Sequence, residues 1–254
     1  KNRRIEPESI RYFRMEIETE STEVRKITLP DEEKFEDQYK YIKEAIKAYP
    51  ELYFAKLVIL GEGDSEEILL PKFLECCGNN VDVSGISIVP LGGRHVNHFW
   101  RLLNDLNIPH ITLLDLDRER EGGGWGRIKY VLKQLIANGH PKEELLKLKS
   151  GKVMTDDELE KMNDWDIHKE ESMQPWIKYL EKFNVFFSVP LDIDFLMLEN
   201  FGEKYKGLLE EKEGPRLMIE KEGKKEQKRS LISKELKRNR MNTKNAYRRI
   251  LEIL

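Results

Sequence analysis

The chain has 254 residues, with 44 Lys and Arg against 47 Asp and Glu, so its formal net charge is −3. Charged residues make up 36% and hydrophobic residues 39%, a balance that excludes collagen-like, disulfide-stapled and membrane-embedded chains. No apolar run approaches the roughly 18 residues of a membrane span, and the charged start is unlike a signal peptide. The two cysteines, Cys76 and Cys77, are neighbours, which favours a reducing compartment such as the cytoplasm. The slight acidity counts against nucleic-acid binding by bulk charge.

The first residues alternate between polar and apolar, which predicts two short strands within residues 1–30. Two strands are too few for a domain, so we expect them to complete a sheet of an N-terminal domain that lies outside this chain. Residues 31–49 have apolar side chains at helical spacing and predict a helix.

From residue 56 onward, short apolar runs alternate with amphipathic stretches of helical length. Strands are predicted at residues 56–60, 86–90 and 110–114, and helices at about 65–77, 95–106 and 125–138. Strands separated by helices of this length indicate parallel βαβ units. We therefore predict an α/β fold, a parallel sheet flanked by helices, with its core in residues 31–140.

The second half of the chain is less regular. Residues 141–183 are charged and helical in pattern, which predicts a helical insertion. A strand at 184–189 and a short helix at 194–200 are expected to return to the sheet, so we assign residues 184–254 to the completion of the same domain. Residues 216–254 hold 13 basic and 5 acidic side chains. We interpret this segment as basic C-terminal helices that contact DNA backbone, rather than as a solvated helix face.

Acidic side chains follow two of the predicted strands. Glu62 comes after the first strand between two glycines, which let the backbone turn and leave the carboxylate exposed. Glu66, in the first turn of the next helix, can reach the same site. Asp115 and Asp117 follow the third strand, and on extended backbone their spacing puts both on one side with Leu116 turned inward.

In parallel α/β sheets, ligands bind beyond the carboxyl ends of the strands, where these carboxylates would meet. Such a cluster is tolerable only with cations between its members. Hard divalent ions prefer oxygen ligands, and two such ions about 4 Å apart can promote phosphodiester cleavage. A glutamate in a first helical turn can instead serve the helix dipole, and Asp-x-Asp alone is common. The two motifs together favour a metal site.

Three motifs carry a resemblance to a known family. The first is Val58–Pro71, which contains Gly-Glu62-Gly-Asp-Ser-Glu66-Glu. The second is Val89–Arg94, which contains Pro-Leu-Gly-Gly. The third is Leu113–Arg118, which contains Leu-Asp115-Leu-Asp117. This pattern resembles a Toprim domain. More narrowly, it is similar to the C-terminal nuclease region of the OLD (overcoming lysogenization defect) family, including the nuclease subunit of the Gabija anti-phage system. The resemblance covers about residues 30–254 and is strongest over 57–120.

The resemblance implies a metal-dependent endonuclease that cleaves double-stranded DNA with two Mg²⁺ or Mn²⁺ ions. It also implies an N-terminal ABC-type ATPase domain, a homo-oligomer and a UvrD-like helicase partner. By the resemblance the metal ligands are Glu62, Glu66, Asp115, Asp117, Glu119 and Asp194, with Glu62 also a candidate general base. A downstream lysine would stabilise the pentacovalent phosphate. Lys224 matches best by spacing, and Lys228 and Lys244 stay open.

Other residues are candidates for phosphate binding. Arg94 follows the second strand in a Gly-Gly-Arg turn, and Arg118 follows Asp117. Arginine forks match phosphate oxygens, and Lys225 and Lys228 add basic charge. His95 and His98 lack neighbouring ligands at zinc spacing. The segment 122–126 is glycine-rich without the Lys-Ser/Thr of a P-loop, so we interpret it as a mobile loop near the metal site.

Two other functions stay open. A phosphatase or phosphotransferase of the haloacid dehalogenase type would use Asp115 as nucleophile and Asp117 as acid. That family expects Thr or Val at position 119, where this chain has Glu, and it gives Glu62 no role. The other is a Toprim module that serves as a scaffold without catalysis. A topoisomerase would also need a tyrosine nucleophile on another domain, which the chain does not visibly carry.

Overall fold

The structure is a computed structural model that describes residues 9–16, 19–29, 31–34, 36, 39–40, 43, 48–92, 96–118, 120–148 and 150–208. The two strands predicted near the start are confirmed as β1 (Arg11–Glu16) and β2 (Ser21–Lys26), which pair antiparallel as a hairpin. This hairpin is a sheet of its own. Its membership in another domain stays a prediction.

The central sheet has four parallel strands in the order β4-β3-β5-β6. Their bounds are β3 (Leu57–Gly61), β4 (Ile86–Pro90), β5 (His110–Asp115) and β6 (Val185–Ser188). Val58, Ile59 and Leu60 are all buried, because helices cover both faces and leave no solvated side for polar residues. The predicted α/β fold with a parallel, helix-flanked sheet is confirmed.

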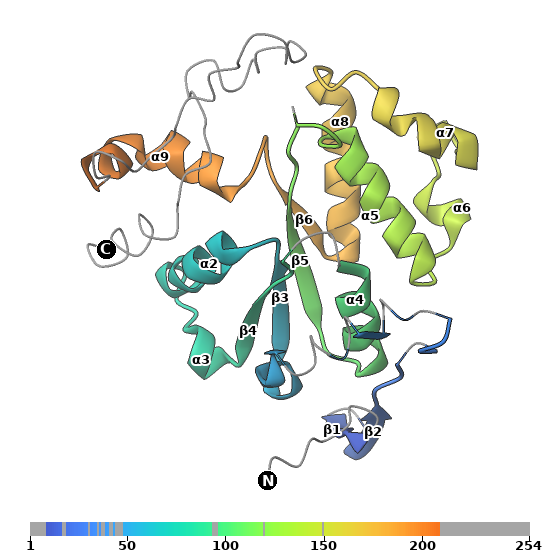
Figure 1. Ribbon diagram of the computed structural model, residues 1–254, viewed down its shortest axis with the longest axis vertical. Coiled ribbons are helices and arrows are strands. Elements are labelled where there is room, and N and C mark those ends of the chain that lie inside the picture. Colours follow the sequence, from blue (N-terminus) through green and yellow to red (C-terminus); the bar gives the residue numbers. More distant parts are fainter. Residues whose placement is uncertain are drawn as a thin grey trace.

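Helices lie on both faces of this sheet (Figure 1). On one face α2 (Asp64–Cys76) and α3 (Val81–Ser84) contact the β3–β4 half, and α9 (Ile193–Leu208) contacts α2. On the other face lie α4 (Val96–Asp105), α5 (Trp125–Ala137) and α8 (Glu170–Leu180). A 3₁₀ helix, η2 (Pro50–Phe54), leads into β3.

The main apolar core fills the space between the sheet and α4, α5 and α8. Phe99, Leu103, Trp125 and Leu132 are each at most 2% exposed within it. The buried indole of Trp100 donates to Thr112 Oγ1 at 2.8 Å, so its polar group is satisfied. This core supports the strands whose ends carry the acidic residues.

The helical character predicted for residues 141–183 is confirmed. The segment contains α6 (Lys142–Leu145), α7 (Asp156–Glu160), η3 (Lys161–Asp164), α8 and η4 (Glu181–Phe183). It packs against the start of α5, where the Trp125 and Trp165 rings meet edge to face at 4.9 Å between centroids. The Trp125 indole also donates to Asp166 O at 3.1 Å. Whether the segment is a separate unit stays a prediction.

Two elements differ from the prediction. The helix expected at 194–200 is α9, which continues to Leu208 across a non-helical residue, Phe201. The single turn α3 was not predicted, because four residues are too few to show a helical period. The basic segment 216–254 and nearly half of the residues expected to form a helix at 31–49 lie outside the described residues. Among the helices that the structure describes, none is both long and apolar enough to cross a membrane.

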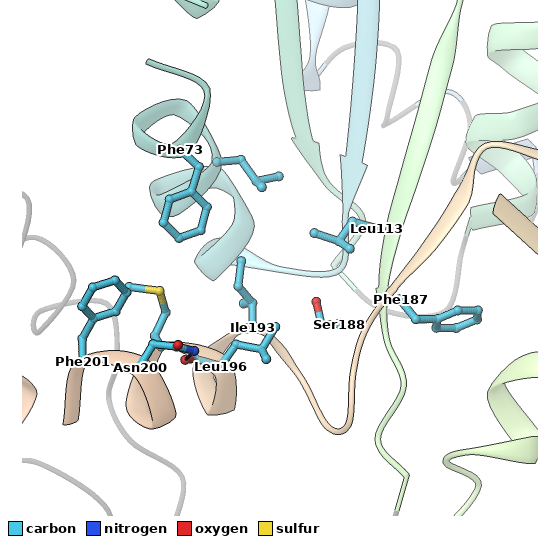
Figure 2. Close-up of a pocket in the computed structure, with 10 residues that line it drawn as sticks. Phe73, Leu113, Phe187, Ser188, Ile193, Leu196, Asn200 and Phe201 are labelled. Carbon is cyan, nitrogen blue, oxygen red and sulfur yellow. Dashed lines mark hydrogen bonds between the residues drawn. The ribbon is translucent and has the colours of Figure 1, made fainter. Parts of the chain in front are cut away.

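An apolar pocket of about 300 Å³ opens on the α2 and α9 face (Figure 2). Phe73 from α2, Leu113 from β5 and Phe201 from α9 line it, with Ser188 at the end of β6. Its described lining contains no carboxylate, so it is not the acidic site predicted from the sequence.

Candidate metal centre

The ends of β3 and β5 bring three acidic side chains together. Because these strands are parallel neighbours, Glu62 and Asp115 leave the sheet at the same edge. One carboxylate oxygen each of Glu62, Asp115 and Asp117 lies within 4.8 Å of the others. We call these three residues the triad. No other group of this kind is found among the described residues.

Asp117 reaches the triad through a turn. The strand β5 ends at Asp115, and Asp117 has a φ of +51°, in the left-handed region. Its N–H donates to Leu191 O at 2.8 Å. The expectation of extended backbone through Asp117 is therefore wrong, because the chain already turns into the next loop. The expectation that Leu116 points inward is confirmed, since this residue is 1% exposed.

The glycine-rich loop holds Asp117 in place. A Cβ on Gly123 would lie 1.7 Å from Asp117 O, so only glycine fits this close approach. Gly124, at a φ of +56°, donates its N–H to Leu116 O at 2.7 Å. The loop therefore lies beside the triad, as predicted. Its mobility stays a prediction.

Both carboxylate oxygens of Glu62 accept hydrogen bonds. Oε2 accepts from the Asp115 N–H at 3.0 Å, and Oε1 accepts from Arg127 Nη2 at 2.6 Å. The Glu62 side chain is only 17% exposed. The prediction of an exposed carboxylate is wrong, because the side chain reaches across to β5 instead of into solvent.

Asp115 is the least compensated member of the triad. Its Oδ1 is buried and has no hydrogen-bond partner within the part of the chain that the structure describes. Burial, and then the charges of Glu62, Asp192, Glu66 and Asp117, raise the pKa of Asp115 to about 9. A buried carboxylate oxygen that lies among other carboxylates and accepts no hydrogen bond from the described residues is suited to bind a cation.

Two arginines outside the sequence prediction supply positive charge. Arg127 on α5 is 6% exposed, and its Nη2 donates at 2.6 Å to both Glu62 Oε1 and Asp117 Oδ2. Arg120 donates from Nη1 to Asp117 Oδ1 and from Nη2 to Asp192 Oδ2, the latter at 2.8 Å. A sequence signal existed for Arg127, which lies four residues before the buried Val131 and so falls on the buried stripe of α5.

Glu66 and Asp194 lie beside the triad but are not members of it. Glu66 is 2% exposed, and its Oε2 accepts the Gly63 N–H at 2.8 Å in the first turn of α2. Burial, together with the charges of Asp194 and Glu62, raises the pKa of Glu66 to about 7 against the opposing Gly63 hydrogen bond. Asp194 accepts a hydrogen bond from Ser65 Oγ at 3.1 Å.

Asp192 is the acidic residue that the sequence reasoning missed. It is 3% exposed, and its Oδ1 accepts the Phe195 N–H at 2.8 Å at the start of α9. Its Oδ2 binds Arg120, and its charge raises the pKa of Asp115. An aspartate three residues before a helical N–H is a capping pattern, which was the available signal.

The remaining predicted residues are placed as follows. Arg118 Nε donates to Ile167 O at 2.7 Å, which ties the loop after β5 to the helical insertion. Five further predicted site residues lie outside the described residues, namely Arg94, Glu119, Lys224, Lys225 and Lys228. The roles predicted for all of these residues stay predictions.

A parallel α/β sheet with clustered carboxylates at its strand ends is the arrangement that the resemblance to a Toprim domain predicts. Residues 53–117 match the family described as "Overcoming lysogenization defect protein-like, TOPRIM domain". This stretch contains β3, β4, β5 and the whole triad. The resemblance to the OLD-type Toprim family is therefore confirmed over these residues.

Two curated relatives are endonucleases by name. Endonuclease GajA of Bacillus cereus strain VD045 is 36% identical over 92 residues, which cover 36% of this chain and 16% of the relative. Endonuclease GajA of Bacillus cereus strain HuB5-5 is 33% identical over 89 residues, which cover 35% and 13%. The chain thus matches only a small part of the length of either relative.

Solved structures of two OLD proteins are also similar to the chain. The C-terminal region of the Xanthomonas campestris pv. campestris OLD protein has a TM-score of 0.40 and 25% identity, covering 63% of this chain and 64% of that one. The C-terminal region of the Burkholderia pseudomallei OLD protein has a TM-score of 0.43 and 23% identity, covering 62% and 68%.

Proposed function

We propose that this chain is the nuclease part of an OLD-type anti-phage defence protein and that it hydrolyses DNA phosphodiester bonds with two divalent metal ions. The observation that carries the proposal is the buried, unpartnered Asp115 Oδ1 within a triad of carboxylates at the ends of parallel strands. The Toprim match and the relatives named endonucleases support it.

The donor set fits a hard divalent cation such as Mg²⁺ or Mn²⁺. The triad offers carboxylate oxygens and neither sulfur nor imidazole, which suits these ions better than zinc. Glu62, Asp115 and Asp117 would hold the first ion, and Glu66, Asp192 and Asp194 are proposed to help hold the second. Bound there, the metal would supply Lewis acidity and a more acidic water.

The chain's own residues would orient this site. The Asp115 N–H and Arg127 hold the two oxygens of Glu62 in place, and Gly123 lets Asp117 turn toward the triad. Arg127 also offsets part of the mutual repulsion of the carboxylates before any ion binds. The lysine for the pentacovalent phosphate (Lys224) and the phosphate contacts (Arg94, Arg118, Lys225, Lys228), like the ligand Glu119, remain part of the proposal.

The alternative of a haloacid dehalogenase-type phosphatase explains fewer of the contacts at this site. That mechanism leaves Glu62 without a role, whereas Glu62 accepts the backbone N–H of Asp115 and shares Arg127 with Asp117.

A plasmid assay tests the nuclease proposal. The purified chain is incubated with supercoiled plasmid and Mg²⁺ or Mn²⁺, with EDTA as the metal-free arm. Nicking should require the metal and fall to background in Glu62→Gln and Asp115→Asn. Asp156→Asn is the matched control, since its side chain is exposed and pairs with Lys142 away from the triad.

Each other outcome is informative. Metal-dependent nicking that survives both site substitutions would overturn the site. Phosphate release from a small phosphomonoester without nicking would favour the phosphatase, and Mn²⁺ binding without either activity would favour a scaffold.

We extend the proposal, on the resemblance, to the whole protein. It would carry an N-terminal ABC-type ATPase domain, form homo-oligomers and work with a UvrD-like helicase in the cytoplasm.

A further inference from the structure

Arg120 binds two carboxylates that come from different parts of the chain. One nitrogen of its guanidinium donates to Asp117 in the loop after β5. The other donates at 2.8 Å to Asp192, which is 72 positions away in the loop after β6. The guanidinium therefore holds these two loops together as a bridging cation would.

The two arginines of the site differ in their access to solvent. The Arg127 side chain is 7% exposed, whereas that of Arg120 is 47% exposed. They bind different oxygens of Asp117, Oδ2 for Arg127 and Oδ1 for Arg120. Arg120 can therefore leave Asp117 without disturbing the contact between Arg127 and that residue.

The carboxylates themselves stay buried when Arg120 leaves. The Asp117 and Asp192 side chains are 9% and 5% exposed. The guanidinium is an ion-pair partner of both carboxylates, and its loss leaves Asp117 with Arg127 alone of the two arginines, so another cation in its place would offset the loss. A divalent ion suits this place because hard cations prefer carboxylate oxygens.

We propose that Arg120 is a displaceable counter-ion of the site: a divalent cation takes its place between Asp117 and Asp192, and the released guanidinium turns outward to bind a DNA phosphate. The inference rests on the proposed function, which supplies both the ion and the DNA. A planar guanidinium fork matches phosphate oxygens as well as it matches carboxylates. Metal loading would thereby add a phosphate-binding group at the entrance of the site.

The first test is Mn²⁺ affinity, measured by calorimetry on metal-free chain. Because Arg120 competes with the ion, Arg120→Gln should bind Mn²⁺ about fivefold or more tightly. Lys133→Gln is the matched control, since the Lys133 side chain is also 47% exposed but pairs with Glu160. Its Mn²⁺ affinity should equal that of the wild type.

Thermal unfolding supplies a readout that does not depend on activity. In EDTA, Arg120→Gln should melt below the wild type, because Asp117 and Asp192 have each lost one ion pair. Mn²⁺ should then raise its melting temperature by more than it raises that of the wild type. Arg120→Lys keeps the positive charge but lacks the planar guanidinium. Its melting temperature in EDTA, and the rise of that temperature with Mn²⁺, should lie between the values of the wild type and of Arg120→Gln.

The second test is duplex binding with Ca²⁺ against EDTA. Wild type should gain affinity with Ca²⁺, and Arg120→Gln should gain less, with a salt slope lower by about one phosphate contact. Unchanged or weaker Mn²⁺ binding in Arg120→Gln overturns the displacement. Equal Ca²⁺-dependent DNA binding overturns the phosphate role. Failure of the wild type to bind Mn²⁺ instead refutes the proposed function itself, so the two failures are distinguishable.

Discussion

The apolar core and the carboxylate cluster are built from the same strands and helices, but they affect stability in opposite ways. Core side chains such as Phe99 and Leu132 are fully packed, so their burial stabilises the fold. Asp115 and Glu66 are buried with raised pKa values, which means that the fold holds them in an unfavourable setting. The difference supports the proposal that the cluster serves metal binding and not stability.

Helix α5 shows how closely the two regions are joined. Leu132 packs in the core, while Arg127, just over one turn earlier, binds Glu62 and Asp117. The packed core residues of α5 thus fix the position of the charged group on the same buried stripe. Substitutions in the two regions should therefore change stability with opposite signs.

The largest effect is expected in the core. Leu132 is 0% exposed, so Leu132→Ala should lower the free energy of unfolding by about 3 to 5 kcal/mol through lost burial and a cavity. Urea denaturation measures this loss. Val83→Ala is the control, since Val83 is 83% exposed and should change stability by less than about 0.5 kcal/mol. Equal effects of the two substitutions would contradict the assignment of this face as the main core.

At the junction of the two regions, Gly123→Ala should cost about 1 to 3 kcal/mol of stability. The added Cβ would lie 1.7 Å from Asp117 O, so the backbone that carries Asp117 must shift. Mn²⁺ affinity should fall together with the melting temperature. Gly202→Ala serves as control, because nothing lies within 4 Å of the new Cβ. Normal Mn²⁺ binding in Gly123→Ala would show that the position of Asp117 is unimportant.

In the carboxylate cluster itself, a substitution should raise the stability of the protein instead of lowering it. Asp115→Asn removes a carboxyl that must take up a proton when the protein folds at pH 8, so metal-free protein should gain about 1 to 2 kcal/mol. The same variant should lose Mn²⁺ binding. Urea denaturation in EDTA measures the gain in stability. A parallel series without EDTA, with and without Mn²⁺, measures the loss of Mn²⁺ binding. A loss of stability in EDTA would mean that Asp115 supports the fold as a core residue does.

The smallest change per step is a gradual pH dependence of the metal-free protein, at most about 1.4 kcal/mol per pH unit for one group. The pKa of Asp115 is raised from 3.8 to about 9, so folded protein keeps a proton that unfolded protein releases. Its contribution to stability is therefore present below about pH 4 and is lost as the pH rises toward 9. Glu66 acts likewise between its ordinary pKa of 4.5 and about 7. Melting temperatures in EDTA should fall across this window. Asp115→Asn should flatten the decline, and a parallel decline in both proteins would contradict the assignment.

Much of the fold could be read from local patterns. The apolar runs that became β3, β4, β5 and β6 were short, continuous and separated by helical stretches, which indicates a parallel sheet whatever the distant contacts are. The convergence of Glu62 and Asp115 followed from the same reasoning, because neighbouring parallel strands end at one edge.

Other features had no local signal strong enough to find them. The turn at Asp117 depends on Gly123 packing on its carbonyl, and the position of the Glu62 carboxylate depends on Arg127 of α5, 65 positions away. Asp192 and Asp194 are separated by one residue, and the capping pattern of Asp192 indicates a helix start but not that this side chain faces the triad. In the structure Asp192 raises the pKa of Asp115, while Asp194 acts on Glu66.

The sequence by itself determined which strands form and which acidic residues follow them, because both depend on the period and order of residues close together in the chain. Only the tertiary structure decided which cations those acids bind. Arg127 is 65 positions from Glu62, and Arg120 is 72 positions from Asp192. Ion pairs of such separation exist only after α5 and the loop after β6 have packed against the sheet edge, so a local pattern cannot reveal them.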